Sequence, residues 1–253
     1  MSFCNSEDFK KNGFLKSGIQ KFKCLNPNCK KSFVALSNTM FDNHKIPISE
    51  WFEFILHLIA FDSISVSSLS NRNAVSTGYY WLKKLFYVLK DEQDSVILKD
   101  RIYLDEKFVS IECKTDNKSQ KKLRGISRNK ICIATAIDKH GNLFCKECGR
   151  GKPSSKRILD VFKNHITEGS IIVHDMEQAH NGIIQKYNLG SEEYKSVGLK
   201  NVKDKDNPLY PINQVHKYMK MFFAKHQPFD KNSLQNWLNL FHFIMSKPNN
   251  GYE

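Results

Sequence analysis

Residues 102–187 change from strand-like to helical hydrophobic spacing, and this order restricts the possible folds more than any other feature. Alternating or continuous apolar residues predict three strands, at 102–111, 130–138 and 142–148. A helix, a short buried strand and a second helix are predicted to follow, at 155–165, 170–174 and 177–187. This succession favours an α/β domain in which helices flank a mixed sheet.

The first part of the chain has a different character. Residues 1–41 are polar, rich in turns and contain only short strand-like pieces, so such a segment needs a metal or another cross-link to fold. Apolar residues spaced three and four apart then predict a helix-turn-helix unit within 51–89. The 253 residues are enough for a sizeable core. We therefore predict three domains, at 1–41, 42–95 and 96–253.

The last part of the chain is predicted to be helical after an irregular stretch. Residues 190–211 are polar, show no clear spacing and are expected to be irregular. Two closing helices are predicted at 212–225 and 233–246, with Pro228 as the helix breaker between them.

Two acidic residues, Asp105 and Asp175, follow apolar strands in matching positions. Asp105 comes after Ile102-Tyr103-Leu104, and Asp175 comes after Ile171-Ile172-Val173-His174. Carboxylates at one edge of a sheet can bind Mg²⁺, which neutralises the attacking and leaving oxygens of a phosphoryl displacement. The pair therefore indicates metal-dependent chemistry on nucleic acid.

A third metal ligand is expected from the helix that begins near residue 212. Asn213 and His216 lie three residues apart there, so they share one face of the helix. A neutral imidazole can bind a metal or position a phosphate, although it prefers softer ions than magnesium. A lone helical histidine is also commonly structural, and only the two acids make His216 a candidate ligand.

Three cysteines in the first segment suggest a structural zinc site. Cys24 and Cys29 lie five residues apart across a tight turn, and Cys4 is the third candidate ligand. A fourth cysteine would fall on Met1, so His44 or a water completes the site, the reading frame begins late, or the site is degenerate. Buried thiols without a metal are the alternative.

Cys145 and Cys148 form a separate C-x-x-C sequence within a predicted strand. Thiols there would point to different faces of the sheet and be poorly placed for one metal ion. We therefore interpret both as packing residues.

The chain is strongly basic, with 39 Lys and Arg against 26 Asp and Glu and a formal charge of +13. The basic residues recur as short clusters, for example Lys118, Lys121, Lys122 and Arg124, which is typical of a surface that follows a polyanion. A soluble basic protein would have similar composition. No window approaches the roughly 20 apolar residues of a membrane span, and no secretion signal is recognisable, so we expect a cytoplasmic, nucleoid-associated protein without a membrane partner.

The third predicted helix carries groups suited to contact with DNA. Its polar face offers hydrogen-bonding and phosphate-pairing side chains, namely Ser76, Thr77, Tyr79, Tyr80, Lys83 and Lys84. Arg150 and Lys152 add a basic cluster in the larger domain. A solvated helix face would have a similar composition, so the assignment as a recognition helix is a hypothesis.

The order of these segments resembles bacterial insertion-sequence DDE transposases that carry an N-terminal transposase-like zinc ribbon. The likeness in the first part lies in Gln20-Lys21-Phe22-Lys23-Cys24, Cys29-Lys30-Lys31-Ser32-Phe33 and Asn38-Thr39-Met40-Phe41. In the second part it lies in Tyr103-Leu104-Asp105-Glu106, Gly149-Arg150-Gly151-Lys152, His174-Asp175, Ile212-Asn213-Gln214-Val215-His216 and the segment from Ser233 to Phe241. The resemblance spans nearly the whole chain.

The resemblance implies an RNase H-like catalytic domain with Mg²⁺ or Mn²⁺, and a zinc ribbon with structural Zn²⁺. It also implies a homo-oligomer on double-stranded DNA that cleaves transposon ends and joins the freed 3′ hydroxyl to target DNA. Asp105 and Asp175 carry over as the first two metal ligands. The third is usually Glu, where this chain has His216, so an inactive copy acting as a DNA-binding regulator, or a nuclease of the same fold, stays open.

Overall fold

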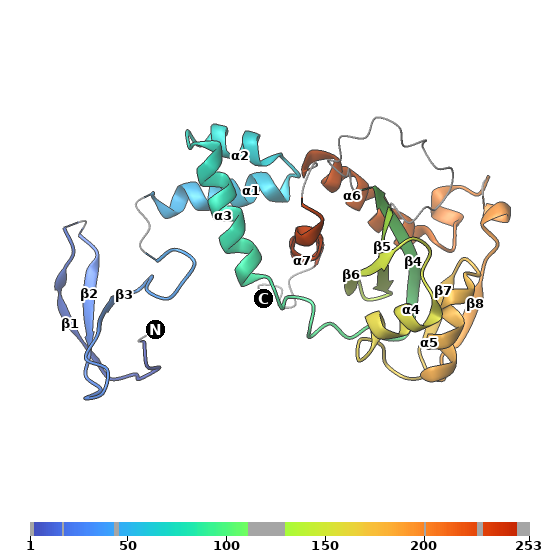
Figure 1. Cartoon of the computed structure of the whole chain (residues 1–253), viewed down its shortest axis with the longest axis horizontal. Coiled ribbons are helices and arrows are strands. Elements are labelled where there is room, and N and C mark those ends of the chain that lie inside the picture. Colours follow the sequence, from blue (N-terminus) through green and yellow to red (C-terminus); the bar gives the residue numbers. More distant parts are fainter. Residues whose placement is uncertain are drawn as a thin grey trace. The chain divides into compact units, whose positions relative to one another are not determined.

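The protein is described by a computed structural model at residues 3–16, 18–42, 46–110, 130–199, 201–226 and 230–246. The chain divides into two compact units, Met1–Val88 and Leu89–Glu253 (Figure 1). The finer division at residues 41 and 95 stays a prediction. Within the described ranges, no helix is long and apolar enough to cross a membrane.

The first unit begins with a small antiparallel sheet. It contains β1 (Phe9–Phe14), β2 (Gln20–Cys24) and β3 (Ser32–Val34), with β2 in the middle. Phe9, Phe22 and Phe33 pack their rings together with centroids 5.4–5.6 Å apart. These three rings supply the apolar cluster of a sheet whose first strand is exposed along its whole length.

Three helices complete the first unit: α1 (Ile48–Ile59), α2 (Ile64–Ser70) and α3 (Val75–Val88). Their core is aromatic, because Trp51 stacks on Trp81 at 4.4 Å and Phe54 meets Trp81 edge to face. Gly78 allows α2 and α3 to approach closely, since a Cβ there would lie 1.9 Å from Oγ of Ser68. The predicted helix, turn and helix are confirmed.

The second unit is built on a five-stranded sheet with the order β6-β5-β4-β7-β8. Its strands are β4 (Arg101–Ser110), β5 (Lys130–Asp138), β6 (Leu143–Arg150), β7 (Ile171–His174) and β8 (Gly190–Glu193). Only β5 runs antiparallel to the other four, because β4 pairs with β5 in antiparallel fashion and with β7 in parallel. This mixed sheet with flanking helices is the predicted RNase H-like α/β fold.

Strand β8 corrects the expectation that residues 190–211 are irregular. Its sequence Gly190-Ser191-Glu192-Glu193 has no apolar residue, yet it pairs in parallel with β7. An edge strand of this kind is held by backbone hydrogen bonds and needs no apolar face, so hydrophobic spacing does not reveal it. The stretch also contains two short 3₁₀ turns, Ser196–Leu199 and Asp204–Asp206.

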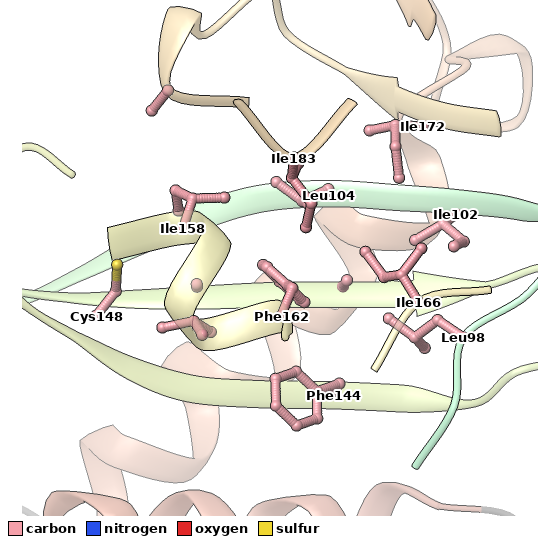
Figure 2. Packing of buried hydrophobic residues seen from close by; sticks show 14 of the residues in the cluster. Leu98, Ile102, Leu104, Phe144, Cys148, Ile158, Phe162, Ile166, Ile172 and Ile183 are labelled. Atoms are coloured by element: carbon pink, nitrogen blue, oxygen red, sulfur yellow. The ribbon is translucent and has the colours of Figure 1, made fainter. Parts of the chain in front are cut away.

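One face of the sheet packs against α4 (Ser155–Phe162) and α5 (Asn181–Lys186). Figure 2 shows Ile158 and Phe162 of α4 directed at the strands, beside Leu104 of β4 and Phe144 of β6. These side chains are fully or almost fully buried and form the larger core of the unit.

The other face carries a smaller cluster and the two closing helices, α6 (Tyr210–His226) and α7 (Leu234–Met245). Ile212 of α6 packs against Val173 of β7, while α7 packs against β6. Gln93 covers the edge of β6, donating to the carbonyl of Cys145 and accepting from its N–H. The predicted breaker Pro228 lies outside the described residues.

Candidate active site

The parallel pairing of β4 with β7 brings Asp105 and Asp175 together. Tyr103 lies opposite Val173 in the register, and the two acids each follow two residues later. Side chains alternate along a strand, so Asp105 shares the face of Tyr103, which is the α6 face. Asp175 follows the end of β7, and its carboxylate is near enough to Asp105 for its charge to act on that residue. The structure thus places the first two predicted ligands side by side.

The pKa of Asp105 reflects both its burial and the nearby carboxylate of Asp175. Burial first, and the negative charge of Asp175 second, raise the pKa of Asp105 to about 7, while the backbone N–H of Glu106 opposes the shift by donating to Oδ1 at 2.8 Å. Two partly buried carboxylates close to each other repel one another, and this repulsion favours binding of a proton or a cation. The pair is therefore a place where positive charge is stabilised.

His216 reaches the same position from α6. Its Nδ1 atom lies 3.4 Å from Oδ2 of Asp105, and its Nε2 atom is buried with no hydrogen-bond partner among the described residues. Burial, followed by the positive charge of Lys107, lowers the pKa of His216 to about 3, so the ring is neutral near pH 7. Asn213, one turn earlier, is exposed.

Lys107 is a residue of this face that the sequence analysis did not single out. It follows Asp105 by two positions on β4, and burial, together with the nearby charge of Lys220, lowers the pKa of the Lys107 ammonium. The alternation of β4 was sufficient to place Lys107 beside Asp105, because i and i+2 share a face.

The opposite face of the same strands carries a buried polar chain that the sequence analysis also missed. Oε1 of Glu106 lies 2.8 Å from Nε2 of His180, and Nδ1 of His180 lies 3.0 Å from Nδ1 of His174. Nε2 of His174 lies 3.0 Å from Oγ of Ser191 on β8. Both histidine side chains are fully buried.

The three predicted zinc ligands of the first unit come together. Sγ of Cys4 lies 3.5 Å from Sγ of Cys24, and the three sulfurs of Cys4, Cys24 and Cys29 lie within 4.8 Å of one another. Burial raises the pKa of the Cys24 thiol. The suggested fourth positions, Met1 and His44, lie outside the described residues.

Cys145 and Cys148 face opposite sides of the sheet. Cys148 belongs to the core beneath α4 (Figure 2), whereas Sγ of Cys145 lies 3.6 Å from the carbonyl of Leu238 on α7. Both are buried, which confirms their interpretation as packing residues.

The predicted DNA-contacting side chains of α3 are mostly exposed. Ser76, Tyr79, Tyr80 and Lys83 are exposed, opposite the buried Gly78, Trp81, Leu82 and Leu85. Thr77 is half-buried. Lys84 is half-buried and donates from Nζ to the carbonyl of Met40 at 2.8 Å, so part of its hydrogen-bonding capacity is used within the unit.

Arg150, Lys152 and Arg157 lie at the loop between β6 and α4. Arg150 is exposed at the end of β6, and the exposed Lys152 pairs with Glu177 at 3.0 Å. Arg157 holds this loop by donating from Nη1 to the carbonyls of Arg150 and Lys152, at 3.1 and 3.2 Å. The cluster Lys118, Lys121, Lys122 and Arg124 lies outside the described residues.

Comparisons with known proteins give distant structural matches. No family model and no curated protein matches the chain. The pre-cleavage Mos1 transpososome is similar at 11% identity and a TM-score of 0.33, over 76% of this chain and 73% of that chain. The catalytic domain of Mos1 mariner transposase is similar at 12% identity and a TM-score of 0.29, over 65% of this chain and 88% of that chain. The RNase H-like assignment rests on the strand order.

Proposed function

We propose that this protein is a DDE-type transposase, which cleaves DNA at the ends of an insertion sequence and transfers the freed strand to target DNA. The observation that carries the proposal is the pairing of Asp105 with Asp175 at one edge of an RNase H-like sheet, with His216 at 3.4 Å from Asp105. Two acids and a third polar side chain on one face form a site for a phosphoryl displacement.

The residues of this site fit a divalent cation, Mg²⁺ or Mn²⁺. The raised pKa of Asp105, caused by burial and then by Asp175, means that added positive charge would relieve an unfavourable pair of carboxylates. The neutral ring of His216, whose Nε2 atom has no hydrogen-bond partner among the described residues, offers a lone pair near them. When bound, the cation would supply Lewis-acid stabilisation of the attacking and leaving oxygens.

The side chains of α6 position the reacting strand in this proposal. His216 would hold its ring against Asp105, and the exposed Asn213 would offer an amide to a phosphate oxygen one turn away. Arg150 and Lys152, both exposed, would bind the backbone of the DNA.

The first unit would bind the transposon ends. The exposed face of α3, with Ser76, Tyr79, Tyr80 and Lys83, has the hydrogen bonders and positive charge that contact bases and phosphates, and Thr77 and Lys84 flank it. The ribbon sulfurs of Cys4 and Cys24 are spaced near the roughly 3.8 Å expected for two sulfurs bound to one tetrahedral zinc ion. We therefore propose a structural zinc at Cys4, Cys24 and Cys29.

The experiment is a strand-transfer assay on double-stranded DNA carrying the inverted repeats that flank the gene. We expect joined product with Mg²⁺ or Mn²⁺ and none with chelator. Asp105→Ala and Asp175→Asn are expected to reduce the product by about 100- to 1000-fold, as loss of a principal electrostatic group does. DNA-end binding, measured by gel shift, is expected to be unchanged.

Asp160→Asn is the matched control, because Asp160 is an exposed acid of α4 on the other face of the sheet. Full activity of Asp105→Ala would contradict the catalytic assignment. Specific binding of the ends without cleavage by the parent protein would favour a regulator. Cleavage without joining or preference for the repeats would favour a nuclease.

A further inference from the structure

The buried histidine pair His174 and His180 lies outside the proposed catalytic face and has the arrangement of metal ligands. Among the described residues, two groups have potential ligand atoms that all lie within 4.8 Å of one another. One is the cysteine group of the ribbon, and the other is His174, Asp175 and His180. The second group combines two imidazoles with one carboxylate.

The two rings approach each other through their Nδ1 atoms. Nδ1 of His174 and Nδ1 of His180 are 3.0 Å apart, with the ring planes at 76°. Two nitrogens that share one ion at about 2.0–2.1 Å lie roughly 2.9–3.4 Å apart, depending on the coordination geometry. The observed separation falls in that interval.

The remaining nitrogen of each ring is held by an oxygen. Nε2 of His180 lies 2.8 Å from Oε1 of Glu106, and Nε2 of His174 lies 3.0 Å from Oγ of Ser191. Metal-binding histidines typically donate their other N–H to a carboxylate or another oxygen, which fixes the ring and leaves the ligating nitrogen unprotonated. Both rings thus have the outer partners that a metal site requires.

Asp175 gives this group of residues a negative charge and its most solvent-exposed member. The two histidines are fully buried, whereas Asp175 is only half-buried at the end of β7. Two neutral imidazoles and one carboxylate are the ligand set of open zinc sites and of other imidazole-binding divalent metals. Magnesium, which prefers oxygen ligands, is a poorer match.

We propose that His174, Asp175 and His180 form a transition-metal site of the zinc class, positioned by Glu106 and Ser191. The site shares Asp175 with the proposed magnesium site but takes its other ligands from the α5 side of the sheet. If the proposed strand-transfer function holds, an ion bound here would withdraw Asp175 from the catalytic pair and inhibit the reaction. Metal binding itself does not depend on that function.

The test uses the full chain, stripped of metal, and Co²⁺ as the spectroscopic probe. Cobalt bound to the ribbon cysteines gives thiolate charge-transfer absorption, whereas an imidazole and carboxylate site gives only visible ligand-field bands. We expect His180→Gln and His174→Gln each to bind one equivalent of Co²⁺ fewer than the parent protein. Their thiolate absorption band should be unchanged. Cys24→Ser is expected to lose the thiolate band and keep the histidine-bound equivalent.

Two further variants separate this site from its neighbours. Asp105→Asn should retain the equivalent of Co²⁺ bound by the histidines. His140→Gln, which changes an exposed histidine of the same unit, should bind as much Co²⁺ as the parent does. Glu106→Gln should weaken binding by roughly 10–100-fold, as loss of an outer partner does. Zn²⁺ should also shift the NMR signals of the His174 and His180 rings in the parent protein, a readout that needs no variant.

The proposal would be overturned if His180→Gln bound as much Co²⁺ as the parent. It would also be overturned if Asp105→Asn lost one equivalent of Co²⁺ and His180→Gln did not. Absence of ring shifts on adding Zn²⁺ would overturn it as well. Each of these results leaves strand transfer by Asp105 and Asp175 untouched, so failure here is distinguishable from failure of the proposed function.

Discussion

Nδ1 of His216 lies 3.4 Å from Oδ2 of Asp105, which joins helix α6 to strand β4 at the edge where Asp175 also lies. Because burial keeps the His216 ring neutral, its contribution to the site is a lone pair and not a charge. The neutral imidazole distinguishes the site from one built of three carboxylates, and it should change which divalent metal the site prefers.

We predict that His216 favours Mn²⁺ over Mg²⁺ in strand transfer. Imidazole is a softer ligand than carboxylate, and manganese accepts it more readily than magnesium does. His216→Glu should raise the ratio of Mg²⁺-supported to Mn²⁺-supported product by about tenfold, equivalent to roughly 1.4 kcal/mol. The measurement compares initial rates at matched metal concentrations, and an unchanged ratio would exclude His216 as a ligand.

We predict that His226 makes the second unit sensitive to acid. Burial lowers the pKa of His226 to about 4 from 6.5, so the unfolded chain binds a proton that the folded chain does not. The stability that depends on the neutral ring is therefore fully present above pH 6.5 and is lost as the pH falls toward 4. Within this window the free energy of unfolding should fall by about 1.4 kcal/mol per pH unit for one proton.

His226→Phe should remove that part of the slope. The ring stacks on Trp237 at 4.7 Å, and neither ring nitrogen has a hydrogen-bond partner among the described residues, so phenylalanine can replace it without losing a bond. Denaturant unfolding between pH 4 and 7 measures the effect. A variant with the parent's pH slope would show that His226 titrates normally in the folded protein.

We predict that Lys83 contributes a phosphate contact when the transposon ends are bound. Its exposed position on α3 leaves its ammonium available to DNA. Lys83→Ala should weaken binding for all sequences and reduce the slope of log K against log salt by about one. Lys163→Ala is the control, because Lys163 is an exposed residue at the end of α4, on the face opposite Asp105. An equal slope in both variants would exclude Lys83 from the contact.

The sequence pattern was sufficient for four of the five strands, β4, β5, β6 and β7, and for the matching positions of the two acids. Asp105 and Asp175 each follow an apolar strand, and parallel neighbours with that pattern bring matching positions together. Strand β8 was missed because its four residues, Gly190-Ser191-Glu192-Glu193, include no apolar side chain, although the strand pairs in parallel with β7. Apolar spacing carries no information about such an edge.

The buried chain Glu106, His180 and His174 was missed for a different reason. The sequence shows His174 inside an apolar strand and His180 in a helical segment, but nothing local indicates that their rings meet. Alternation did place Glu106 on the face opposite Asp105, which was the available signal. The convergence itself depends on how the turn after β7 returns to the sheet, and hydrophobic spacing cannot predict that path.

The most direct test of the central claim, that Asp105 and Asp175 share a divalent cation, is the titration of the aspartate carboxyls by ¹³C NMR with and without Mg²⁺. We predict a pKa of about 7 for Asp105 in metal-free protein, raised by burial and by Asp175, and a lower value in Asp175→Asn. Saturating Mg²⁺ should lower the pKa of Asp105 by about one unit or more, because the cation favours the ionised form. An Asp105 pKa near 3.8 without metal, or one that Mg²⁺ leaves unchanged, would contradict the account.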